Sequence, residues 1–120
     1  MEQSFFLEQT MRPELSGYRI MWMIIMFDLP VGSKKERKAA NDFRTFLQDM
    51  GFDRAQFSIY YRVMGGKEVA ERYIRRIEGR VPASGSVNIL TITDKQYENM
   101  ICFLGKEKNE PPPVQQLTLF

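Results

Sequence analysis

The first candidate for chemistry is a single carboxylate, Asp28, which follows an unbroken apolar run from Ile20 to Phe27. A buried strand that ends on a polar residue presents that residue on a rigid scaffold. Carboxylate oxygens are ligands that Mg²⁺ prefers, and this ion keeps most of its waters when few carboxylates bind it. Asp28 is therefore a candidate metal ligand and catalytic residue for metal-assisted phosphodiester cleavage.

One aspartate cannot complete such a site. A two-fold symmetric homodimer would bring a second copy of Asp28 toward the first, and we expect Mg²⁺ to bind between the two copies. The alternative is that Asp28 only starts the turn continued by Leu29 and Pro30, as aspartate does before bends that contain proline.

Four cations open the helix predicted to come next: Lys34, Lys35, Arg37 and Lys38. The helix macrodipole disfavours positive charge at a helix start, so this cluster works against helix stability. A phosphate partner would explain the arrangement, since helix N-termini and basic side chains both bind phosphate. The alternative is an ordinary solvated helix face.

A second basic set lies on a later predicted helix and contains Arg72, Arg75, Arg76 and Arg80. Between Val31 and Arg80 the sequence has twelve Lys or Arg against seven Asp or Glu. A basic middle fits a polyanion partner such as duplex DNA. Contacts from these arginines, chiefly Arg75 and Arg76, to a nucleic-acid backbone would not depend on base sequence.

The segment from Phe52 to Met64 alternates with a period of two, which predicts a strand, or two strands divided by a bend or a tight hairpin. One side is apolar, with Ala55, Phe57, Ile59, Tyr61 and Val63. The other side carries Arg54, Gln56, Ser58, Tyr60 and Arg62. This second side suits nucleic-acid contact, a polar dimer interface or plain solvation.

The composition excludes several classes of site. The 120-residue chain has no histidine and one cysteine, Cys102, so Ser/His and Cys/His pairs, an intrachain disulfide and most zinc sites are ruled out. Cys102 lies between two apolar residues, which predicts a core thiol and a cytoplasmic location. The opening apolar run is too short to cross a membrane, and residues 1–17 lack the features of a signal peptide.

The elements that must position these residues follow in a simple order. We expect a strand over 18–27, a helix capped by Ser33 and Glu36 that ends at Gly51, strand structure over 52–64, a helix over 67–79 and a strand over 87–93. This order predicts an α+β ferredoxin-like βαββαβ sandwich over 18–105. The first strand is then central, and its continuous apolar character predicts a homodimer joined through the sheet faces.

The C-terminal part is expected to begin with a short helix from Asp94 to Gly105. A proline-rich linker over 106–113 and an extra C-terminal strand over 114–120 then follow. Leu117, Leu119 and Phe120 of that strand are candidate partner-binding residues, since an added strand can pair with another protein. Residues 1–17 are expected to be an N-terminal extension.

Three stretches together resemble one known family: "MIIMFDLP" followed by a basic helix, "GFDRAQFSIYYRV" and "VNILTITDKQYENM". They are similar to the CRISPR-associated adaptation proteins of the Cas-two family, most of all to members from type II systems. The resemblance covers roughly residues 17–105. It implies a ferredoxin-like fold, a homodimer, a metal-dependent nuclease activity reported for some members, and a role bridging integrase subunits on captured DNA.

The resemblance also assigns residues. Asp28 matches the family's metal aspartate at the end of the first strand. Arg54 and Tyr60 match the arginine and the aromatic residue of the family's "R-x-Q-x-S-x-F" stretch, and Arg37 matches a basic residue after the aspartate motif.

The resulting hypothesis is a spacer-acquisition subunit that binds duplex prespacer DNA as a dimer and bridges the CRISPR integrase, with Mg²⁺-dependent cleavage of DNA or RNA. One alternative is a DNA-binding scaffold without catalysis. Another is a ferredoxin-like regulatory domain that binds a small ligand between protomers.

Overall fold

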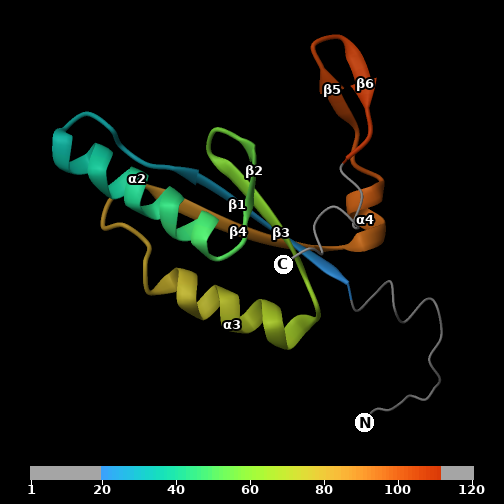
Figure 1. Ribbon diagram of the computed structural model, residues 1–120, viewed down its shortest axis with the longest axis horizontal. Coiled ribbons are helices and arrows are strands. Elements are labelled where there is room, and N and C mark those ends of the chain that lie inside the picture. Colours follow the sequence, from blue (N-terminus) through green and yellow to red (C-terminus); the bar gives the residue numbers. More distant parts are fainter. Residues whose placement is uncertain (1–19, 112–120) are drawn as a thin grey trace.

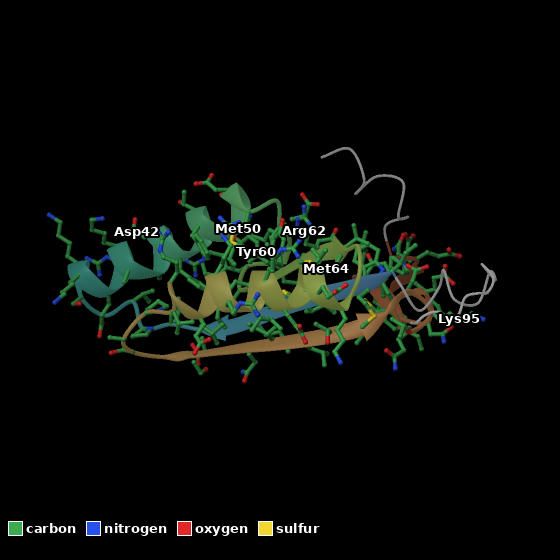
Figure 2. The ribbon with its side chains drawn as sticks, turned by 90° about the horizontal axis from the view of Figure 1, so that it is seen from below. Asp42, Met50, Tyr60, Arg62, Met64 and Lys95 are labelled. Carbon is green, nitrogen blue, oxygen red and sulfur yellow. The ribbon has the colours of Figure 1, made fainter. Side chains whose placement is uncertain are left out.

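A computed structural model describes residues 20–111 and contains one four-stranded antiparallel sheet. The strand order across the sheet is β2 (Asp53–Gln56), β3 (Ile59–Met64), β1 (Met21–Asp28) and β4 (Ser86–Thr93). Two helices, α2 (Lys34–Asp49) and α3 (Lys67–Glu78), cover one face of this sheet (Figures 1 and 2). The chain order β1-α2-β2-β3-α3-β4 confirms the ferredoxin-like βαββαβ fold, with the apolar first strand at a central position.

Helix α2 begins as its sequence predicts. The Ser33 hydroxyl accepts a hydrogen bond from the Glu36 backbone N–H at 3.0 Å, and the Glu36 carboxylate accepts one from the Ser33 N–H at 3.0 Å. This reciprocal capping box satisfies two backbone donors that a helix start leaves unpaired. The helix ends at Asp49, and Gly51 follows in the left-handed region with φ of 90°. The N-terminal capping box at Ser33 therefore fixes where the chain turns into α2 after Asp28.

The main core lies between the helices and the sheet. Alternate residues of β1 point into it, and α2 contributes aromatic and aliphatic side chains at helical spacing. Its largest buried members include Met23, Ile25, Phe27, Phe43, Leu47, Tyr60, Met64 and Ile77. Burial of these side chains holds both helices against β1, so the end of β1 is a rigid position.

A two-residue turn at Phe57 and Ser58 divides the segment 52–64 into a tight hairpin, with a register shift between Arg54 and Gln56. Within β3 the period of two is correct, but the side predicted to be polar faces the helices. Tyr60 is fully buried there, and Arg62 places its guanidinium 4.7 Å from the centre of the Tyr73 ring on α3 (Figure 2). The prediction that this side of β3 is polar and exposed is therefore wrong, because Tyr60 and the aliphatic part of the Arg62 side chain pack into the core.

The opposite sheet face carries a smaller cluster in which the rings of Trp22 and Tyr97 stack 3.7 Å apart at 6°. Tyr97 belongs to α4 (Asp94–Glu98), whose N-cap is Thr93 rather than Asp94. No helix within residues 20–111 covers the rest of this face. The row formed by Tyr61, Ile24 and Leu90 crosses its centre, and Leu90 is 47% exposed. This open apolar face is the surface that we expected a second subunit to cover.

The helix predicted from Asp94 to Gly105 is wrong beyond Glu98. Two short strands, β5 (Cys102–Leu104) and β6 (Glu107–Asn109), form a hairpin instead, and Figure 1 shows this hairpin standing away from the main sheet beyond α4. The start of the predicted linker at residue 106 therefore lies inside this hairpin. Cys102 is only half-buried, so it is not a core thiol. Most of the apolar residues here are exposed and do not pack on the sheet. A helix over this segment would therefore lack the packed apolar face that stabilises helices in proteins.

Several predicted segments lie outside the described residues. These are the extension over 1–17, the first residues of the first predicted strand, and the C-terminal strand with Leu117, Leu119 and Phe120. The division of the chain at these points stays a prediction.

Candidate metal centre and nucleic-acid interface

The topology gathers the predicted site residues at one end of the sheet. Because neighbouring strands are antiparallel, the end of β1, the turn between β2 and β3, and the start of β4 meet at the same end of the sheet. Helix α2 starts and helix α3 ends toward that end of the sheet (Figure 1). We call this region the Asp28 end. Basic side chains of both helices therefore approach the same part of the molecule as Asp28.

The side chain of Asp28 is exposed, while its backbone is tightly held. Its register partner on β4 is Ser86. The preceding N–H, that of Phe27, donates to the Ser58 carbonyl at 3.1 Å. A β-carbon added to Gly85, which has φ of 95°, would lie 2.6 Å from the Asp28 carbonyl oxygen. Only glycine lets this loop approach so closely, so the Asp28 backbone is fixed by neighbours on both sides.

The carboxylate of Asp28 forms no hydrogen bond or ion pair within residues 20–111, so its oxygens are open to a cation or to water. Exposed carboxylate oxygens are suitable ligands for Mg²⁺. Within the same residues, no three acidic, thiol or imidazole side chains lie close enough together to hold a metal ion. The metal centre between two copies of Asp28 stays a prediction.

The four cations at the start of α2 are all exposed, as expected. Two of them have local partners: Arg37 donates to the Val31 carbonyl at 3.2 Å, and Lys38 forms an ion pair with Asp42 at 2.9 Å. Lys34 and Lys35 make no such contact in the described part of the chain. The start of α2 therefore presents exposed positive charge after the loop that follows Asp28, and the Arg37 guanidinium is anchored to this loop.

The arginines of α3 line a shallow depression of about 350 Å³ together with Tyr73. Arg75 and Arg76 lie in the last turn of the helix, where positive charge is favoured by the macrodipole. Both side chains are exposed. Stability therefore accounts for their position in α3, unlike that of the cations at the start of α2, and their exposure leaves them free to contact phosphate.

The two remaining predicted nucleic-acid contacts, Arg54 and Tyr60, have different environments. Arg54 is exposed on the edge strand β2, where it can reach a nucleic acid. Tyr60 is 0% exposed, so the prediction that its ring contacts nucleic acid is wrong for this fold. The period of two placed Tyr60 beside Arg54, but the sequence could not say which side the helices cover.

Sequence reasoning missed Phe57 and Arg44. Phe57 was assigned to an apolar strand face but lies at the turn, 67% exposed. The guanidinium of Arg44 lies 4.2 Å from the centre of its ring. One available signal was the length of the alternating segment, for which a hairpin turn was the alternative to a single strand.

Comparison with known proteins gives a consistent family. The model of the family described as CRISPR associated protein Cas2 matches residues 21–100. A CRISPR-associated endoribonuclease Cas2 of Paracidovorax avenae is 49% identical over 94 residues, which are 78% of this chain and 87% of that protein. One of Flavobacterium psychrophilum is 45% identical over 107 residues, 88% of this chain and 93% of that protein. Within residues 20–111, no helix is long and apolar enough to cross a membrane.

Proposed function

Because this chain belongs to the CRISPR-associated Cas2 family, we propose that it is a cytoplasmic, dimeric subunit of CRISPR adaptation with Mg²⁺-dependent nuclease activity. The single observation that carries the nuclease part is the open carboxylate of Asp28 on a rigid strand end. The names of the two relatives above describe endoribonucleases, which makes RNA a candidate substrate beside DNA.

The residues of this chain have separate tasks in the proposed reaction. Asp28 of each protomer holds Mg²⁺, which when bound supplies charge neutralisation at a phosphodiester. The cations at the start of α2, with Arg54, Arg75 and Arg76, hold the nucleic-acid backbone at the Asp28 end. The close packing of Gly85 and Ser58 around the end of β1 keeps the carboxylate in place during cleavage.

A second function rests on the distribution of charge rather than on Asp28. A dimer with basic helix ends can hold duplex DNA and bridge the CRISPR integrase without cutting anything. We propose this bridging role for the chain as well. Leu117, Leu119 and Phe120 are the candidate contacts for the integrase.

One experiment separates the two functions. Asp28→Asn is compared with the wild type in Mg²⁺-dependent cleavage of RNA and DNA, and in spacer integration with the cognate integrase. The matched control is Asp49→Asn, another exposed carboxylate, at the end of α2. If Asp28 holds the metal, Asp28→Asn lowers cleavage by at least about 100-fold while Asp49→Asn does not. Intact integration by Asp28→Asn supports the scaffold role, and full cleavage by Asp28→Asn contradicts the nuclease site.

A further inference from the structure

The turn between β2 and β3 exposes a large aromatic ring where small polar residues or glycine are usual. Phe57 is 67% exposed, and its neighbour Ser58 accepts the hydrogen bond from the Phe27 N–H, one residue before Asp28. The ring therefore lies at the Asp28 end. An exposed phenylalanine ring keeps more apolar surface in water than a smaller residue would, which is unfavourable in free energy.

Two arginines hold this ring from different elements. The guanidinium of Arg44, on α2, lies 4.2 Å from the centre of the Phe57 ring and 5.5 Å from that of the buried Phe27 ring. Arg54, on β2, approaches the Phe57 ring at 5.9 Å. Distances of this size correspond to cation–π attraction. Phe57, Arg44 and Arg54 thus form one surface, which we call the aromatic–arginine patch.

Arg44 itself is anchored. Its Nη1 donates to the Asn41 side-chain oxygen at 3.3 Å, and its Nε is buried without a hydrogen-bond partner within residues 20–111. Residues 37, 41 and 44 lie at i, i+4 and i+7 on α2, so Arg37, Asn41 and Arg44 follow one helix face toward the patch. This row supplies hydrogen-bond donors on the helix face that leads to the patch.

From this geometry we infer that the aromatic–arginine patch binds a nucleotide whose base is unpaired, by stacking the base on the exposed ring of Phe57, which Arg44 supports. The inference deepens the proposed function and rests on it. Proteins take up single-stranded nucleic acid by combining basic grooves with aromatic and arginine planes, on which bases stack. In a closed duplex the base faces are already stacked on one another, so the patch gains nothing from paired bases except phosphate contacts.

The position of the patch gives it a role in the reaction. The turn that carries Phe57 is joined to the end of β1 by the Phe27–Ser58 backbone hydrogen bond. In the proposal, the patch therefore selects single strands, bulges or frayed ends for the candidate metal centre. Arg54 then contacts phosphate on either kind of substrate. The alternative is that Phe57 contacts a protein partner, and the measurements of affinity and molecular mass distinguish this contact from nucleotide binding.

The test uses the full-length chain and the variant Phe57→Leu, which keeps apolar volume but removes the aromatic face. Its matched control is Phe103→Leu, the same change at a phenylalanine that is 60% exposed on the hairpin β5–β6. Affinities are measured by fluorescence anisotropy at fixed salt for single-stranded RNA, single-stranded DNA and a blunt duplex of the same sequence. Molecular mass is measured in parallel by light scattering.

We expect Phe57→Leu to weaken binding of at least one type of single strand by about 5- to 100-fold, the range that loss of one stacked base gives. Duplex binding should stay within about two-fold of wild type, and Phe103→Leu should change neither. Equal effects of Phe57→Leu on single strand and duplex, or no effect on either, overturn the inference but leave the proposed function standing. An altered molecular mass with unchanged affinities identifies a protein contact and also overturns it. A wild type that binds none of the three substrates overturns the proposed function as well.

Discussion

At the scale of single residues, Tyr97 joins α4 to the open side of the sheet. Its ring stacks on Trp22, whose indole N–H donates to the Asp94 carboxylate at 2.8 Å. The Tyr97 hydroxyl is buried and has no hydrogen-bond partner within residues 20–111. Burial raises the pKa of Tyr97 above its usual value, and the nearby Tyr61, Cys102 and Asp94 add to the effect. Tyr97 is therefore a neutral aromatic side chain in the folded protein.

This environment predicts an alkaline loss of stability. Above about pH 10 the unfolded chain releases the Tyr97 proton while the folded chain keeps it, so the free energy of unfolding falls as pH rises. Tyr97→Phe removes this group, so its free energy of unfolding should fall less between about pH 9 and about pH 11. At neutral pH the variant should equal the wild type or gain up to about 1 kcal/mol, because the deleted hydroxyl has no partner. Urea denaturation at each pH measures both, and parallel curves for the two proteins would contradict the assignment.

Asp28 and the four cations at the start of α2 occupy the positions in the fold that the sequence predicted, because an apolar run and a capping box mark these boundaries. Their roles in binding metal and phosphate stay predictions. Tyr60 and Phe57 were placed on the wrong surfaces because their exposure depends on where the hairpin turns and which sheet face the helices cover. The alternating pattern of a strand indicates neither the position of the turn nor which sheet face the helices cover.

At the scale of elements, the loop from α3 to β4 fixes the position of Asp28 through Gly85. Gly85→Ala should lower the free energy of unfolding by about 1–3 kcal/mol, because the added carbon meets the Asp28 carbonyl in a backbone conformation that alanine disfavours. The same shift should move Asp28 and lower any Mg²⁺-dependent cleavage. Gly65→Ala is the matched control, since nothing lies within 4 Å of the added carbon there. Equal stability and cleavage of the two variants would contradict the role of Gly85.

The elements also show where sequence patterns fail. Strand β1 and helix α2 were predictable because each buries a continuous or periodic apolar set. The segment after Glu98 has apolar residues at spacings that a helix tolerates, but Ile101, Phe103 and Leu104 are exposed. Gly105, with φ of 64°, begins the two-residue loop between β5 and β6, and this was the signal for a hairpin.

At the scale of the whole molecule, the open sheet face predicts the dimer. Leu90→Asp places a carboxylate on β4 in the row with Ile24 and Tyr61, where burial against a second subunit would cost at least about 2 kcal/mol. The variant should be monomeric and folded by light scattering and circular dichroism. Val81→Asp, at a similarly exposed aliphatic residue outside the sheet, should stay dimeric. A dimeric Leu90→Asp protein would place the interface elsewhere.

In the proposed metal centre two copies of Asp28 act together, and mixed dimers can show whether both are needed. Wild type and Asp28→Asn are co-expressed in equal amounts, so that the two chains assemble at random, and Mg²⁺-dependent cleavage is measured per total protein. If both carboxylates are needed, only wild-type pairs are active, and the activity falls to about one quarter of the wild-type value. An activity of about one half would mean that each protomer cleaves alone, and it would contradict the shared metal centre.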